Sequence, residues 1–199
     1  MNDVKMDLST LFSILKDKYP FEYKLKANSN EFWLCETNNE TYVDPEFSII
    51  TEFSNCKLDE AQVMLISAVG ATGKSELTKK LSYSLKIPVV DLGKTKVVGG
   101  NSLTGLIFQH LKPLEGGQWL EDIQNGKTCM IIDALDEGYQ KTNTQGFFDF
   151  LDDVGEKIPK DDCSFIMLGR TNAIELASLY LDGQGIKVAV LQIEPFSLE

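Results

Sequence analysis

The chain has 199 residues, of which 43% are hydrophobic and 25% are charged, a composition typical of globular proteins. No apolar run approaches the roughly 18 residues of a membrane span, so we expect no transmembrane helix. The formal net charge of −11 argues against direct, nonspecific binding to nucleic acids. The four cysteines have neither C-x-x-C spacing nor histidine companions, which argues against a zinc site and favours a reducing, cytoplasmic setting.

Residues 1–60 are predicted to form a small N-terminal α+β segment, distinct from the rest of the chain. An amphipathic helix is expected over 7–19, and a hairpin is expected from the runs 21–26 and 31–35. The residues around 41–45 read as extended, because the residue before Pro45 avoids the helical region. A polar stretch before residue 61 then connects this segment to a second part, 61–199.

An alternation of strands and helices from residue 61 onward predicts a parallel sheet with helices on both faces. We therefore expect the three-layer α/β sandwich of a P-loop NTPase. The expected strands are 62–67, 87–91, 128–133, 163–169 and 186–193. The expected helices are 75–86, 101–112, 117–124, 145–157 and 172–181, with Asn101 and Thr144 as N-caps of two of them.

A phosphate-binding loop is predicted between the first of these strands and the first helix. The run Ala68-Val69-Gly70-Ala71-Thr72-Gly73-Lys74-Ser75 follows the pattern G-x-x-x-x-G-K-[ST], with Ala68 in place of the first glycine. Backbone N–H groups from Gly70, Ala71, Thr72 and Gly73 onward would surround the phosphates of ATP or ADP. Lys74 would reach the β- and γ-phosphates, and the Ser75 hydroxyl would bind Mg²⁺.

Acidic residues follow the third expected strand, in the sequence Asp133-Ala134-Leu135-Asp136-Glu137. A carboxylate at the carboxyl end of a parallel strand lies at the sheet edge where α/β proteins bind ligands, so Asp133 is predicted to hold Mg²⁺ opposite Ser75. Many P-loop ATPases have a water-activating glutamate directly after this aspartate. Here Ala134 occupies that position, which leaves Asp136 or Glu137 to orient the attacking water, with Asp136 the first choice. The alternative for both acids is a solvated helix start.

Arg170 is the only arginine among the 19 basic residues of the chain. It follows the fourth expected strand and therefore faces the same sheet edge as Asp133. A guanidinium pairs bidentately with phosphate, so Arg170 is predicted to contact the γ-phosphate during catalysis. The alternative is an ordinary surface arginine.

These motifs resemble those of the NACHT-type STAND ATPases. The resemblance covers about 61–199 and is carried by the loop 70–75, the D-A-L-D-E form at 133–137, and the Gly-Arg-Thr at 169–171. In that family a small residue stands where Ala134 stands, and an arginine ends the strand called sensor 1. The resemblance implies a five-stranded parallel sheet of order 5-1-4-3-2, with Arg170 on the strand between the two nucleotide-binding motifs.

The resemblance also implies a molecular switch that exchanges ADP for ATP, forms homo-oligomers on activation and controls an attached effector, often in antiviral defence. Family members carry further domains after the ATPase core, so we expect residues 61–199 to be part of a longer protein. The enzyme activity implied is a slow ATPase. Two other functions stay open from the residues: a small-molecule or nucleotide kinase, which the shortage of arginine disfavours, and a scaffold that binds nucleotide without hydrolysing it.

Overall fold

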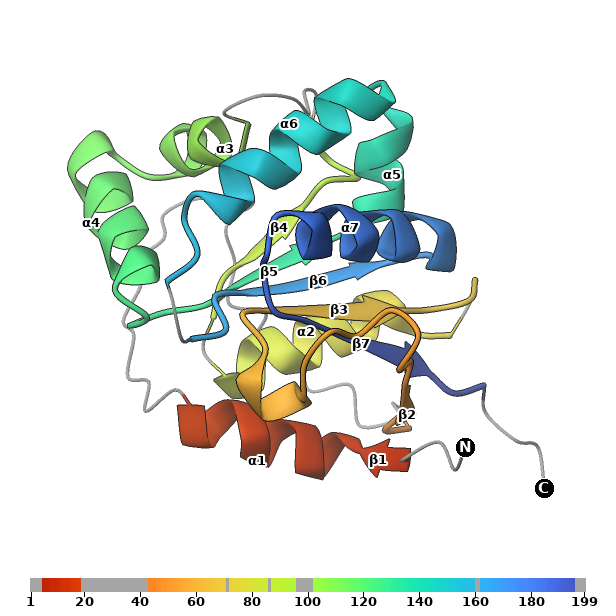
Figure 1. The fold of residues 1–199 in the computed structure, drawn as a ribbon. Helices are drawn as coiled ribbons and strands as arrows, with labels where there is room; N and C mark the ends of the chain where they lie inside the picture. Colours follow the sequence, from red (N-terminus) through yellow and green to blue (C-terminus); the bar gives the residue numbers. More distant parts are fainter. Residues whose placement is uncertain are drawn as a thin grey trace.

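One mixed sheet of seven strands organises the residues that the computed structural model describes, namely 5–18, 43–70, 72–85, 87–95, 102–159 and 162–195. The strands are β1 (Lys5–Asp7), β2 (Glu46–Ile49), β3 (Val63–Ser67), β4 (Val89–Asp91), β5 (Met130–Asp133), β6 (Phe165–Gly169) and β7 (Val188–Ile193). They lie in the order β1-β2-β7-β3-β6-β5-β4 (Figure 1).

The expectation of a five-stranded, wholly parallel sheet is corrected by the two strands of the N-terminal segment. β2 pairs antiparallel with β7, and β1 pairs antiparallel with β2, so both extend the same sheet. The other five strands are parallel to one another and follow as β7, β3, β6, β5 and β4. Ranked along the chain, these five have the order 5-1-4-3-2, and β6 separates β3 from β5.

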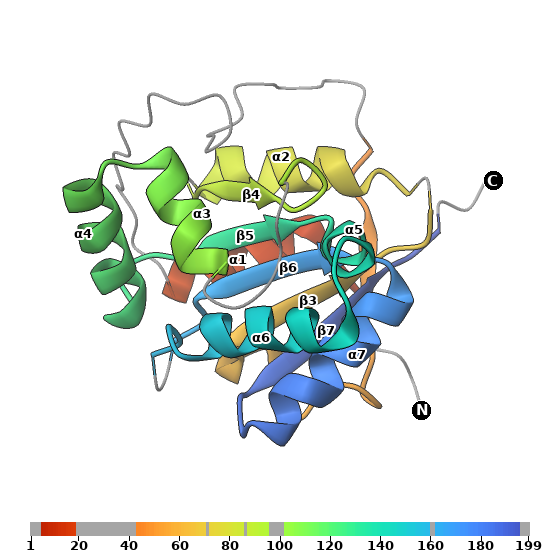
Figure 2. The same ribbon diagram turned by 90° about the horizontal axis from the view of Figure 1, so that it is seen from above.

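Seven α-helices and one 3₁₀ turn accompany the sheet in the described residues. They are α1 (Leu8–Lys18), η1 (Leu58–Glu60), α2 (Lys74–Leu85), α3 (Ser102–His110), α4 (Pro113–Gln124), α5 (Leu135–Gln140), α6 (Thr144–Gly155) and α7 (Thr171–Gly183). Helices α1 and α2 cover one face of the sheet and α3 to α7 lie on the other (Figures 1 and 2). The result is three layers, with the sheet buried between two layers of helices.

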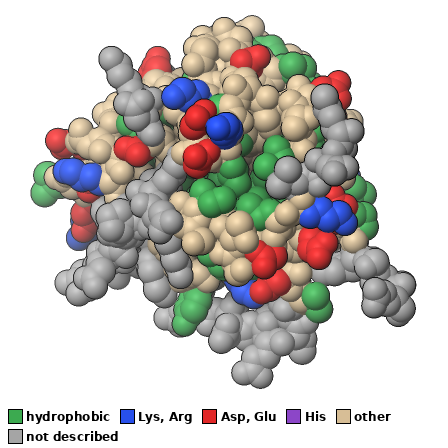
Figure 3. Space-filling view, turned by 60° about the horizontal axis from the view of Figure 1, so that its bottom comes forward, with side chains coloured by type: hydrophobic (Ala, Val, Ile, Leu, Met, Phe, Trp, Pro, Cys, Tyr) green, Lys and Arg blue, Asp and Glu red, His purple; other side chains and the backbone are tan. Residues whose placement is uncertain are grey.

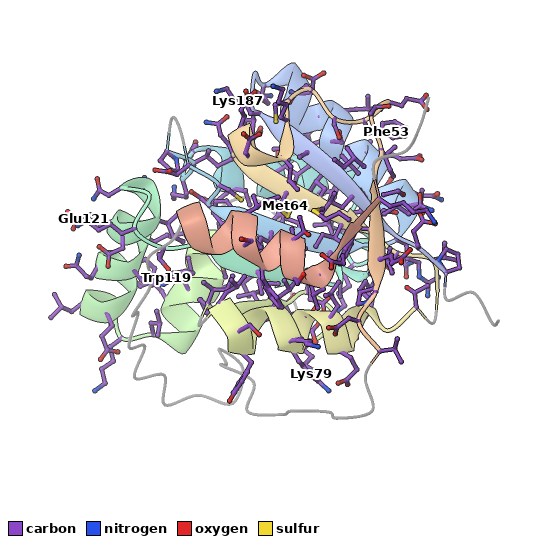
Figure 4. All side chains as sticks on the ribbon, turned by 90° about the horizontal axis from the view of Figure 1, so that it is seen from below. Phe53, Met64, Lys79, Trp119, Glu121 and Lys187 are labelled. Carbon is purple, nitrogen blue, oxygen red and sulfur yellow. The ribbon has the colours of Figure 1, made fainter. Side chains whose placement is uncertain are left out.

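The strands contribute alternate side chains to two separate hydrophobic cores. On β3, Val63 and Leu65 belong to the core beneath α3, α4, α6 and α7, whereas Met64 and Ile66 belong to the core beneath α1 and α2. Figure 4 shows Met64 on the side of α1. Because both faces are covered, β3 is buried at every position, as expected of a central parallel strand.

Most of the predicted helices are present, with differences at their ends. The apolar stripe Leu77, Leu81 and Leu85 of α2 is buried as expected. The N-cap of α6 is Asn143 and not Thr144, because the Asn143 side chain accepts a 2.8 Å hydrogen bond from the Gly146 N–H. Asn101 lies outside the described residues, as do the two strands of the expected hairpin.

The N-terminal helix α1 agrees with the helix expected over 7–19, and Leu8, Leu11 and Leu15 on its inner face are buried. Ahead of β2, Asp44 forms an ion pair with Lys80 of α2. On the face in Figure 3, the described Lys and Arg side chains lie next to Asp and Glu side chains. None of the helices in the described part of the chain combines the length and apolar character that crossing a bilayer requires.

Candidate functional site

The predicted site residues lie at the carboxyl ends of three neighbouring strands. Ser67 at the end of β3 is aligned with Gly169 at the end of β6, and β6 in turn pairs with β5, which ends in Asp133. The three segments that follow these strands therefore begin at one edge of the sheet, on the right of Figure 1. The hydroxyls of Ser67 and Thr171 form a 3.1 Å hydrogen bond, which joins the end of β3 to the segment that follows β6.

The loop after β3 is held by backbone and side-chain hydrogen bonds. The Ala68 N–H donates to the Gly169 carbonyl at 3.0 Å, and the Thr72 hydroxyl donates to the Val69 carbonyl at 2.8 Å. Gly73 has a φ of +79°, a conformation that favours glycine and turns the chain into α2 at Lys74. The first N–H groups of a helix have no partner inside it, so this turn presents donors to an anion. Ala71 lies outside the described residues.

Alanine at position 68 is compatible with the loop. Ala68 is 1% exposed and its N–H is paired, so it is packed and hydrogen-bonded at the end of β3. Among the described residues, Ala134 is the only one other than glycine with a positive φ. Ala68 therefore does not need the conformational freedom of the glycine that it replaces.

Asp136 brings together two of the cations that the sequence predicted for the site. Its Oδ1 lies 3.1 Å from Lys74 Nζ, and its Oδ2 lies 3.2 Å from Arg170 Nε. The backbone N–H of Arg170 also donates to Oδ1, at 3.1 Å. The carboxylate side chain is 9% exposed, while Lys74 is 21% and Arg170 67% exposed, so the inner pair is better shielded from water.

A left-handed residue and a glycine set the position of Asp136. Ala134 has φ 59° and ψ 42°, which turns the chain sharply from β5 into α5. A Cβ on Gly169 would stand 3.1 Å from Leu135 Cβ and 3.5 Å from the Asp136 backbone nitrogen. The absence of a side chain at Gly169 thus lets the first turn of α5 approach β6, and the Asp136 carboxylate reaches the start of α7.

Asp133 lies deeper, with 7% of its surface exposed. Burial raises the pKa of its carboxyl above 3.8, and the negative charge of Asp91 adds to this. The Ala134 N–H, which donates to Oδ1 at 2.7 Å, the charge of Lys74 and a hydrogen bond with Thr78 oppose the rise in pKa. Ser75 stands three residues before Thr78 on α2, so it is on the same side of that helix as the residue that meets Asp133.

Glu137 is directed to a different part of the edge. It is exposed, and a Cβ built on Gly93, just after β4, would stand 2.5 Å from Glu137 Oε2 and 2.9 Å from Asp91 Oδ1. Of the two acids proposed to orient water, Asp136 is therefore the one that contacts Lys74 and Arg170.

Lys141 fixes the other end of α5, a role that the sequence analysis missed. Its Nζ donates to the carbonyls of Leu92, at 2.8 Å, of Thr95, at 2.9 Å, and of Gly93. The cation thus holds the turn after β4 against the C-terminal end of the helix. Thr78, Ser67 and Thr171 were also missed, because hydroxyl residues in a helix or at a strand end give no distinctive sequence signal.

The groups at this edge suit a polyphosphate and a hard divalent cation. They comprise an ammonium, a guanidinium, the N–H groups at the start of α2, a hydroxyl at Ser75 and a buried carboxylate at Asp133. No group of three or more His, Cys, Asp or Glu side chains in the described ranges is arranged to hold a metal ion. A Mg²⁺ ion here would consequently take most of its ligands from phosphate oxygens and water, as Mg²⁺ commonly does.

Comparison of the chain with models of protein families gives no match, and comparison with curated proteins gives none either.

Proposed function

We propose that this chain carries the ATP/ADP-binding switch core of a STAND-type P-loop NTPase, similar to the NACHT group and acting in the cytoplasm. The support is physical: a strand–loop–helix with a glycine turn, a lysine at the helix start, and an aspartate at the end of a nearby strand. In the proposed role, the core regulates oligomerisation of a larger defence or signalling protein.

The observation that carries the proposal is the meeting of Lys74 and Arg170 on a single carboxylate at the sheet edge. Two cations from segments 96 positions apart (170 − 74) converge there, beside the N-terminal turn of α2. An isolated lysine in a glycine-containing turn would not require this convergence. A phosphate group that enters the site would find both cations and the helix N–H groups within one small region.

Each residue has a defined part in this proposal. Lys74 holds the β- and γ-phosphates, and the backbone of 70–75 surrounds them. Ser75 and Asp133 hold Mg²⁺, which would lower the negative charge of the phosphates for attack by water. Arg170 contacts the γ-phosphate, and Asp136 orients the water, with Glu137 as the alternative for that role.

Slow hydrolysis is expected of the chain by itself. Arginine residues supplied to phosphoryl-transfer sites increase the rate by about 10³–10⁵-fold. Arg170 is the only arginine in the sequence and is assigned to the site of its own chain. A second copy therefore has no other arginine to donate to that site. A turnover of about 10 s⁻¹, the median for enzymes, would contradict this expectation.

The test is calorimetric titration of the purified chain with ADP and with ATP, each with MgCl₂ and with EDTA. We expect saturable binding by the wild type and none by Lys74→Ala at the same concentrations. Lys79→Ala is the matched control, because Lys79 is on the same helix and pairs with Glu76. Absence of binding by folded wild-type protein at millimolar nucleotide would refute the proposed function.

A scaffold that retains nucleotide without hydrolysing it is the second candidate. Two observations favour it: Ala134 stands directly after Asp133, and Asp136 is engaged by both cations. Chromatography of nucleotide released from the purified protein, followed by incubation with ATP, distinguishes the two. Bound ADP and no phosphate release would favour the scaffold.

A further inference from the structure

The contacts of Asp136 raise a question about the free protein, because they occupy the groups that phosphate would use. Oδ1 accepts hydrogen bonds from Lys74 Nζ and from the Arg170 backbone N–H, and Oδ2 forms an ion pair with Arg170 Nε. A carboxylate bound in this way satisfies donors with the same geometry and charge sign as two oxygens of a phosphate. While Lys74 pairs with Asp136, the negative charge of the carboxylate weakens the attraction between Lys74 and a phosphate.

We propose that Asp136 is an internal competitor of the nucleotide: its carboxylate occupies the phosphate position in the free chain and must leave when a polyphosphate binds. The inference rests on the proposed function, which supplies the polyphosphate, and it adds a regulatory role to Asp136. The exchange involves no covalent step. One anion replaces another on Lys74 and Arg170, and the carboxylate becomes available to orient water only after that replacement.

The surroundings of Asp136 support an exchange of this kind. The carboxylate is 9% exposed, so it does not simply lie in solvent, yet Arg170 is 67% exposed and can keep a partner while moving. The helix that carries Asp136 has only six residues and begins at a left-handed turn. No other acidic side chain among the described residues forms an ion pair with Lys74 or Arg170.

The competition predicts an effect on affinity opposite to that of an ordinary binding residue. Asp136→Asn removes the competing charge, and we expect it to bind ADP and inorganic pyrophosphate about tenfold or more tightly than the wild type, the change that loss of one charge-assisted hydrogen bond produces. Asp91→Asn is the matched control. Asp91 ends β4 at the same sheet edge but pairs with Lys94, so it reports only the long-range effect of removing one negative charge.

Calorimetry of the three proteins decides the matter, provided that urea denaturation shows each to be folded. Tighter binding by Asp136→Asn than by Asp91→Asn supports the competition. Equal binding by the two variants, or weaker binding by Asp136→Asn, overturns it while leaving nucleotide binding by the wild type intact. Failure of the wild type to bind would instead refute the proposed function.

A second measurement needs no nucleotide and no variant that must fold. Arg170 is the only arginine, so its Nε–H gives a single arginine signal in a ¹H–¹⁵N spectrum of the free wild-type chain. Arg170 Nε lies 3.2 Å from Asp136 Oδ2 in an ion pair, so pyrophosphate should shift this resonance as a phosphate replaces the carboxylate beside the guanidinium. An unchanged resonance at pyrophosphate concentrations that saturate binding would show that the anion beside Arg170 is not replaced and would overturn the inference.

Discussion

The two ends of β5 and β6 contain polar groups of very different character. At the carboxyl ends, Asp133 and Asp136 are buried acids, and Asp136 forms an ion pair with Arg170, whose side chain is 67% exposed. At the amino ends, Thr128, Cys129, Cys163 and Ser164 are buried at 0–1% exposure. The Thr128 and Ser164 hydroxyls have no hydrogen-bond partner among the described protein atoms. Burial raises the pKa of the Cys129 thiol well above 9.0, so this group stays neutral.

The comparison indicates that the carboxyl ends are the better candidate for a binding site. The four buried residues at the amino ends carry hydroxyls and thiols, and the described contacts include no ion pair made by any of these four. The carboxyl ends contain Ala134, the only residue other than glycine with a positive φ in the described part of the chain, two positions before the ion-paired carboxylate of Asp136. A left-handed residue other than glycine costs stability, and its place beside the ion-paired carboxylate supports a functional reason for it.

The largest expected effect comes from changing the turn at Ala134. Valine is strained at a φ of 59°, so we expect Ala134→Val to lower the free energy of unfolding by about 1–2 kcal/mol. We expect Ala134→Gly, the matched variant, to change it by less than about 1 kcal/mol, because relief of strain opposes the greater freedom of the unfolded chain. Urea denaturation measures both. Equal stability of the two variants would contradict the left-handed turn.

A smaller effect is expected at the amino ends. Thr128→Val replaces a buried hydroxyl that lacks a partner with a methyl group of the same shape, and should raise the free energy of unfolding by about 1 kcal/mol. Nucleotide affinity should not change, because Thr128 is at the opposite end of β5. Denaturation and calorimetry on one preparation test both statements, and loss of stability would mean that the hydroxyl has a partner.

The smallest expected effect is a change in pH dependence at Asp133. Because burial raises the pKa of this carboxyl above 3.8, the folded chain keeps its proton to a higher pH than the unfolded chain. The wild type therefore loses stability as pH rises from about 3.8 through the folded-state pKa, and the loss is complete above it. Asp133→Asn lacks this loss, so its stability relative to wild type should increase across that window and then level off.

Denaturation midpoints of the two proteins between pH 4 and 8 provide the measurement for Asp133. A constant difference across the range would show that the pKa is not raised. In the same variant, nucleotide binding should depend less on Mg²⁺ than in the wild type, which titrations with and without EDTA would detect.

Local sequence patterns were enough to predict much of this fold. Leu77, Leu81 and Leu85 recur at helical spacing and are buried on α2, and the apolar run of 62–67 is the central strand β3. The N-terminal strands were not predicted to join the sheet. The runs 5–7 and 46–49 are too short to show a period, and the pairing of β1 with β2 and of β2 with β7 depends on contacts distant in sequence.

The candidate site was predicted as a set of residues but not as an arrangement. Lys74, Asp133 and Arg170 follow motifs, so their place at one sheet edge could be anticipated. That Asp136 contacts both Lys74 and Arg170, while Glu137 faces Gly93, depends on the left-handed Ala134 and the missing side chain of Gly169. Alanine gives no local signal for that conformation, so only the three-dimensional structure reveals it.

Lys141 gives α5 a mechanical property beyond its small size. The ammonium of Lys141 donates hydrogen bonds to three carbonyls of the turn after β4, while the opposite end of the helix carries Asp136. A six-residue helix is about 9 Å long and too short to bend. If Asp136 swings away from its cations, the helix should pivot as one piece and pull on the turn beyond the outermost parallel strand. Binding beside Asp136 would then change the position of the turn after β4.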